Sequence, residues 1–152
     1  CQRLGILVDV SHISDEAFWQ IMDITEKPII ASHSNSREVC DVGRNLTDDM
    51  FRAICATGGV AGFNMCPPFV SENPDLDNCC DHILHFLELD PAGTHIALGG
   101  DLDGIEDTPV GFSGVQDYPK LAQKLLERGV DEKIVMNIFW NNALGVIDKC
   151  SM

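Results

Sequence analysis

The sequence lacks any apolar run approaching the roughly 20 residues that a helix needs to cross a bilayer, so we expect no membrane segment in this chain. Positive charge is also scarce, with 10 Lys and Arg against 24 Asp and Glu and a formal net charge of −14. Such a surface repels phosphate backbones and anionic lipid heads. Nucleic acids and membrane surfaces are therefore excluded as expected partners.

Several common site motifs are missing as well. The chain has no G-x-S-x-G nucleophile elbow and no phosphate-binding P-loop, and its D-L-D-G stretch lacks the downstream glutamate of a calcium loop. The number of cysteines, seven, is odd, and none forms a C-x-x-C pair, which argues against a disulfide framework or a zinc ribbon. Reduced, buried thiols fit this pattern better, and they favour a cytoplasmic location.

Apolar runs and helical patterns alternate along the chain. The runs predict strands at 4–10, 29–32, 60–65 and 95–100, and the helical patterns lie at 13–24, 45–59, 78–89, 118–128 and 132–147. Ser14, Thr47 and Asp131 stand where helix N-caps are expected. All four predicted strands are continuously apolar, which indicates burial on both faces and a parallel sheet. The sequence thus predicts an α/β domain.

Polar side chains follow three of these four strands. His12 and His33 come after the first two, each preceded by a serine, and Asp101 comes after the fourth. The carboxyl ends of parallel strands lie on one edge of a sheet, where α/β proteins place their active sites. A single histidine there is usually structural, but two with a nearby carboxylate match the ligands of a zinc-type ion and a proton carrier.

The remaining histidines are assigned to surface or packing roles. His82 and His85 are one helical turn apart but have no H-E-x-x-H motif around them, and His95 begins a strand at the opposite end of the sheet.

Five segments in order carry a family resemblance: V-D-V-S-H-I-S, P-I-I-A-S-H-S-N-S-R-E-V-C-D-V-G-R-N-L-T-D-D-M, G-G-V followed by G-F-N, A-L-G-G-D-L-D-G-I, and the C-terminal segment from Y-P-K-L to A-L-G-V-I. Together they closely resemble the membrane (renal) dipeptidase family of zinc metallopeptidases, M19-type. The resemblance extends over essentially the whole chain.

That family folds as a TIM-type (β/α)8 barrel with two Zn²⁺ ions. The resemblance implies that residues 1–152 are the C-terminal half of one barrel domain, with strands five to eight. It also implies that His12 and His33 are ligands of the second zinc ion. The family's early His-x-Asp pair and bridging glutamate are supplied by no part of this chain, so we expect the isolated chain to be inactive.

The resemblance assigns roles to four further residues. Arg44 would hold the terminal carboxylate of the substrate, since its planar guanidinium can pair two oxygens at once. Asp101 would be the catalytic carboxylate. Asp103 is expected to brace its loop rather than react, and Asn45 to fix the loop after Arg44.

The implied function is hydrolysis of dipeptides, L-L and possibly L-D, by a metal-bound hydroxide, with a dipeptide as substrate. A homodimer is left open, because members of the family often form dimers. Two alternatives also remain: a catalytically incomplete barrel that binds a ligand or partner, and another amidohydrolase-type barrel. The R-N-L-T-D-D segment argues against the last of these.

Overall fold

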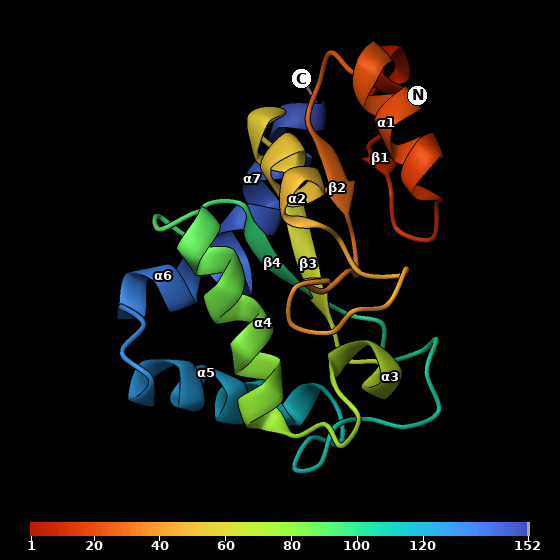
Figure 1. The fold of residues 1–152 in the computed structure, drawn as a ribbon. Coiled ribbons are helices and arrows are strands. Elements are labelled where there is room, and N and C mark those ends of the chain that lie inside the picture. The colour runs from red at the N-terminus through yellow and green to blue at the C-terminus, as the bar shows by residue number, and fades with distance from the viewer. Residues whose placement is uncertain (152) are drawn as a thin grey trace.

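A four-stranded parallel sheet forms the centre of the molecule (Figure 1). The computed structural model describes residues 1–151. The strands follow one another in the order of the chain and are β1 (Val8–Asp9), β2 (Ile29–Ala31), β3 (Val60–Asn64) and β4 (Ile96–Gly100). Neighbouring strands are all parallel, as the sequence predicted. Their carboxyl ends therefore share one edge of the sheet.

Helices connect the strands and continue beyond the last of them. They are α1 (Asp15–Ile24), α2 (Asp48–Ala56), α3 (Pro67–Val70), α4 (Leu76–Leu89), α5 (Tyr118–Glu127), α6 (Glu132–Met136) and α7 (Asn142–Ser151). The predicted N-caps are confirmed, because Ser14, Thr47 and Asp131 each accept a hydrogen bond from a main-chain N–H in the first turn of their helix. Within the described residues, no helix is long and apolar enough to cross a membrane.

The first strand is much shorter than the predicted 4–10. Residues Gln2–Leu4 form a 3₁₀ turn, and only Val8 and Asp9 pair with β2. The apolar side chains before the strand stay in contact with solvent, with Leu4 71% and Ile6 51% exposed. Within β1 itself Val8 is half-buried and Asp9 is exposed, so the prediction of burial on both faces is wrong for this strand. Among residues 1–151 this strand pairs only with β2, so it lies at the edge of the sheet.

Two further segments differ from the sequence prediction. The Pro-rich loop after β3 contains the short helix α3, whose start suits proline because the first turn has no partner for an N–H. The single helix predicted at 132–147 is interrupted by a π-helical turn at Asn137–Asn141 and then continues as α7 to Ser151. Periodicity alone does not detect one widened turn inside a helix.

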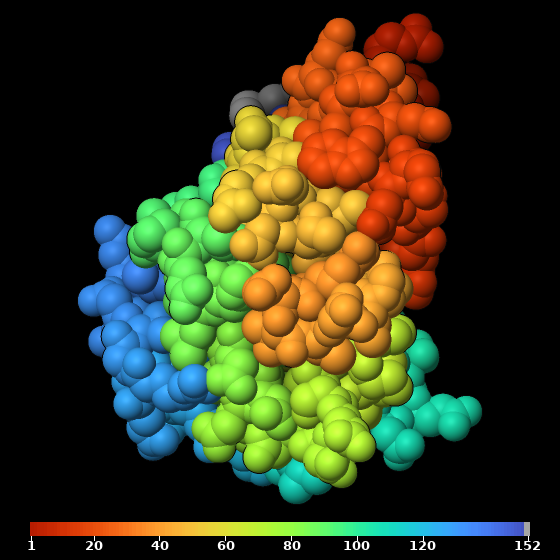
Figure 2. All heavy atoms as spheres, viewed as in Figure 1, coloured from red at the N-terminus to blue at the C-terminus, as the bar shows by residue number. Residues whose placement is uncertain are grey.

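The core lies between the sheet and the helices α2 and α4. Phe51 of α2 and Phe86 of α4 are both buried and stack with ring centroids 4.2 Å apart at an interplanar angle of 11°. A smaller cluster joins Val60 and Ala97 of the sheet to Val146 of α7. The segment after β4 projects from the body of the molecule (teal in Figure 2).

Asp117 gives a testable pH dependence of stability. It accepts hydrogen bonds from the Ser113 N–H and hydroxyl and pairs with Lys120 at 2.7 Å. The lysine, followed by the serine hydrogen bonds, lowers its pKa from 3.8 to about 2. Because the folded pKa is below the unfolded one, the stabilisation is present above pH 3.8 and is lost as the pH falls toward 2.

We therefore expect wild-type stability to fall more steeply over this pH range than that of Asp117→Asn. Urea unfolding of both proteins at a series of pH values measures the difference. Parallel pH curves for the two proteins would contradict the assignment.

Candidate functional site

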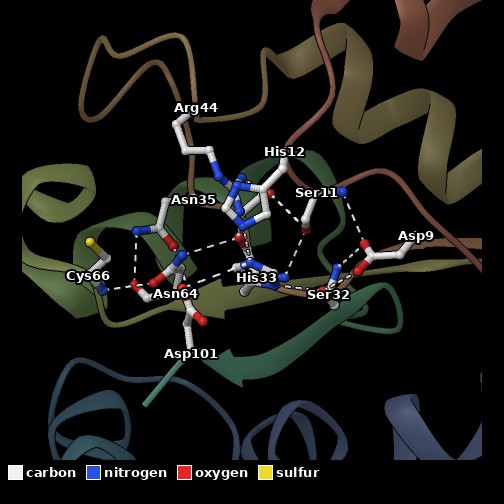
Figure 3. Close-up of polar contacts among 11 residues, drawn as sticks. Asp9, Ser11, His12, Ser32, His33, Asn35, Arg44, Asn64, Cys66 and Asp101 are labelled. Atoms are coloured by element: carbon white, nitrogen blue, oxygen red, sulfur yellow. Dashed lines mark hydrogen bonds and ion pairs between the residues drawn. The ribbon is translucent and has the colours of Figure 1, made fainter. Parts of the chain in front are cut away.

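The carboxyl edge of the sheet brings the predicted site residues together (Figure 3). His12 follows β1, His33 follows β2 and Asp101 follows β4. The Nε2 atoms of His12 and His33 are 2.7 Å apart, and His33 Nε2 lies 3.9 Å from Asp101 Oδ2. The side chains of His33 and Asp101 are largely covered, whereas His12 is exposed. Residues 89 positions apart in the chain thus form one cluster.

Two of these residues have an uncommon backbone conformation. His12 has φ = 70° and Asp101 has φ = 62°, and no other residue than glycine has a positive φ in the described part of the chain. A side chain in this region costs about 1–3 kcal/mol and persists only where the surroundings hold it. Around Asp101 they do so through the hydrogen bond from its N–H to Gly99 and from the Gly104 N–H to its carbonyl. Such outliers gather at functional sites.

Arg44 reaches the same cluster from the loop after β2. Its Nη1 donates to Ser34 Oγ at 2.7 Å and its Nη2 to the His33 carbonyl at 2.8 Å. The Nε–H is buried without a partner, and the guanidinium lies 5.8 Å from the centre of the Phe69 ring. Burial lowers the pKa of Arg44, but a guanidinium remains charged at neutral pH. A fixed positive charge therefore stands beside the histidines.

Asn45 and Asp103 differ in burial and in hydrogen bonding. Asn45 is buried, and its amide donates to the carbonyls of Cys40 and Phe69 at 2.9 Å each, which ties the loop after β2 to α3. The structure shows these contacts, and the loop-fixing role stays a prediction. Asp103 is exposed and makes no hydrogen bond or ion pair within residues 1–151, so the structure shows no bracing by it.

The other three histidines lie outside the cluster. His82 is buried, with its ring between the Val70 carbonyl and the Ser36 N–H. His85 contacts Asp48 at 2.7 Å, and His95 Nδ1 lies 2.8 Å from the Gly59 carbonyl. Each ring has a structural partner, as the sequence indicated.

Sequence reasoning assigned no role to several polar residues that support the cluster. Asn64 donates to the His33 carbonyl, and Asn35 in turn accepts a hydrogen bond from the Asn64 N–H at 2.7 Å. Asp9 accepts from the main-chain N–H groups of Ser11 and Ser32. Burial opposes the ionisation of Asp9, but hydrogen bonds from Ser32 and Ser11 outweigh it and lower its pKa. These residues could have been found by the rule that identified the histidines, since each is a polar residue at or just after the end of a strand.

The histidine pair fits a zinc ion in chemistry but not in number of ligands. Burial lowers the pKa of His33, and Asp101 only partly offsets this effect, so the imidazole is neutral at pH 7 and has a lone pair to offer. The two Nε2 atoms converge. No group of three or more ligand side chains occurs among the described residues, whereas zinc takes four ligands. A catalytic zinc site leaves one of the four positions to water, so His12 and His33 are an incomplete set of protein ligands.

Comparison with known proteins places the chain in a family. The sequence profile of the membrane dipeptidase family, peptidase family M19, matches residues 1–151. The chain belongs to this family. Two relatives from Schizosaccharomyces pombe, both described as uncharacterised dipeptidases, are 38% identical over 147 residues and 37% identical over 131 residues. These matches cover 95% and 83% of this chain but only 36% and 31% of the relatives.

Solved structures of the family share the fold. A metallopeptidase from Rhodobacter sphaeroides, crystallised with a phosphinate mimic of the dipeptide L-Ala-D-Ala, superimposes with a TM-score of 0.92 at 27% sequence identity. The match covers 99% of this chain and 44% of that one. The four β/α units are accordingly part of a TIM-type barrel, and the chain spans less than half the length of these members.

Proposed function

We propose that this chain forms part of a zinc-dependent dipeptidase and supplies strands five to eight of its barrel. The convergence of His12, His33 and Asp101 beside Arg44 carries this proposal. Membership of the family and the dipeptide mimic bound to a relative support a dipeptide as substrate, with L-L and L-D dipeptides as the candidates. The proposed reaction is hydrolysis of the peptide bond.

Each residue has a distinct part in this reaction. His12 and His33 would hold the ion through their Nε2 atoms. Zinc, when bound, supplies a Lewis acid that polarises the peptide carbonyl and makes water more acidic. Arg44 would orient the substrate through its terminal carboxylate, since its Nη groups have further N–H donors beyond those used for Ser34 and His33. Asp101 would take a proton from the attacking water and deliver it to the leaving amine.

The number of ligands decides what the isolated chain can do. Because the described residues offer two nitrogen ligands and no third, we expect this chain alone to bind zinc weakly and to be inactive. An incomplete barrel that binds a ligand or partner without catalysis is the second candidate, and the same ligand count favours it.

Zinc content and hydrolysis of a panel of L-L and L-D dipeptides test the proposal. Both should be measured on this chain and on a form extended upstream to the full set of barrel strands. We expect only the extended form to bind about two zinc ions and to cleave dipeptides, in keeping with the two ions of the family site. An extended form that folds but neither binds zinc nor cleaves any dipeptide would leave the binding scaffold as the function.

A further inference from the structure

A chain of hydrogen bonds links Asp9 to the ring of His33 through Ser32 (Figure 3). Ser32 Oγ lies 2.5 Å from Asp9 Oδ2 and 2.6 Å from His33 Nδ1. A serine hydroxyl has one proton to donate, and an ionised carboxylate can only accept. The Ser32 proton therefore points to Asp9, so that Ser32 Oγ must accept a hydrogen bond from His33. This requires the proton of the neutral His33 ring to be on Nδ1.

The opposite nitrogen of the ring is consistent with this assignment. With its proton on Nδ1, His33 has a lone pair on Nε2, which faces His12 Nε2 at 2.7 Å. His12 then donates that hydrogen bond, so His12 carries its proton on Nε2. Asp101 Oδ2, at 3.9 Å from His33 Nε2, is too far away to accept a hydrogen bond from it.

We propose that Asp9 and Ser32 are positioning residues that hold His33 in the Nδ1–H tautomer and so preset its Nε2 as a metal-binding nitrogen. The metal-binding part of this inference rests on the proposed function, whereas the tautomer itself does not. Hydrogen bonding of the distal ring nitrogen to a carboxylate or another acceptor is how proteins orient histidine ligands. Here the carboxylate acts through an intervening hydroxyl.

The two histidines are therefore not equivalent. His33 has its lone pair directed into the cluster before any ion arrives. His12 Nδ1 has no hydrogen-bond partner in the described residues, and its Nε2 carries the proton. Only His12 has to change tautomer for both Nε2 lone pairs to point at one ion.

The backbone holds this arrangement in place from two sides. Asp9 is fixed because its Oδ1 accepts the N–H groups of Ser11 and Ser32 at 3.0 and 2.9 Å. The Ser32 carbonyl packs so closely on β4 that a Cβ at Gly99 would lie 1.9 Å from it. The main chain of Ser32 is thus held by Asp9 and packed on β4, and its hydroxyl is held by its contacts with Asp9 and His33.

Nitrogen-15 NMR of the histidine rings in the metal-free chain tests the tautomer directly. A neutral histidine in water prefers the Nε2–H form. In a folded protein, the hydrogen bonds of the two ring nitrogens set the tautomer and can reverse this preference. We expect His33 to show a protonated Nδ1 and an unprotonated Nε2, and His12 to show the reverse. Signals are assigned by their loss in His12→Gln and His33→Gln.

Substitutions at Ser32 and Asp9 then test whether these residues set the tautomer of His33 or only support the fold. Ser32→Ala should move His33 to the Nε2–H form, and Ser32→Thr, which keeps the hydroxyl, should restore the wild-type signals. Asp9→Asn should weaken the Nδ1–H preference without removing Ser32. Ser36→Ala is the matched control, because Ser36 follows the same strand and its buried hydroxyl has no hydrogen-bond partner among the described residues. It should leave the tautomer unchanged.

In the extended form, Ser32→Ala should also weaken zinc binding about 10–100-fold, the usual effect of removing a hydrogen-bond partner of a histidine ligand. An Nε2–H tautomer of His33 in the wild-type chain, or an unchanged tautomer in well-folded Ser32→Ala and Asp9→Asn, would overturn the inference. The tautomer and zinc-binding measurements do not require the protein to hydrolyse a dipeptide. If the extended form binds no zinc while the Nδ1–H tautomer is observed, the proposed function fails and the hydrogen-bond assignment stands.

Discussion

Replacing Asp101 with asparagine should lower kcat for dipeptide hydrolysis by about 10²–10⁴-fold, the usual contribution of a general acid or base. Asparagine keeps the size of the side chain and tolerates a positive φ, which is 62° at this position. The backbone turn after β4 should therefore survive, while the group that accepts and returns a proton is removed. KM should change little, because Arg44 and not Asp101 would hold the carboxylate of the substrate.

Steady-state kinetics on the extended form measure this effect, with zinc content determined in parallel. Asp107→Asn is the matched control, since it makes the same change of charge on an exposed residue of the same loop. Its activity should stay close to wild type. If Asp101→Asn retained more than about a tenth of the wild-type kcat with full zinc, the proton-transfer role would be wrong.

Phe86→Ala should destabilise the chain by about 3–5 kcal/mol, as expected for removal of a buried phenylalanine ring. Phe86 lies in α4 and is 1% exposed, and its ring stacks on Phe51 of α2. The truncation leaves a cavity between these two helices. Domains have only about 5–15 kcal/mol of stability in total. The substitution should therefore remove a large fraction of the free energy of unfolding.

Urea unfolding monitored by circular dichroism measures the loss. Val115→Ala is the control, because Val115 is 70% exposed and surface changes usually stay within about 0.5 kcal/mol. Phe86→Leu should fall between the two, since it refills part of the cavity. A loss below about 1 kcal/mol for Phe86→Ala would show that the two helices repack without the ring.

Much of the fold could be predicted because its signals are local. Apolar runs alternating with amphipathic segments identified four strands and most helices, and the caps Ser14, Thr47 and Asp131 were read correctly from residue type and position. The short helix α3 and the π-helical turn at Asn137–Asn141 were not predicted. Both depend on how a segment packs against its neighbours, which residue patterns do not record.

The candidate site was also predicted only in part from the sequence. The sequence predicted that His12, His33 and Asp101 would share one edge of the sheet, because the carboxyl ends of parallel strands do so whatever the details of packing. It did not predict the Nε2–Nε2 distance of 2.7 Å, the positive φ at two of the three residues or the part of Asp9 and Ser32. These features arise from turns and hydrogen bonds between segments more than twenty residues apart.

The sequence by itself determined the β/α order, the edge of the sheet that carries the polar side chains and the resemblance to the family, because each depends on residue type and spacing. Only the tertiary structure decided that β1 shrinks to two residues and leaves Leu4 and Ile6 exposed. It also decided which nitrogen of His33 faces the cluster. An exposed strand edge and a ring tautomer depend on which groups lie opposite in space, and only the folded chain brings those groups together.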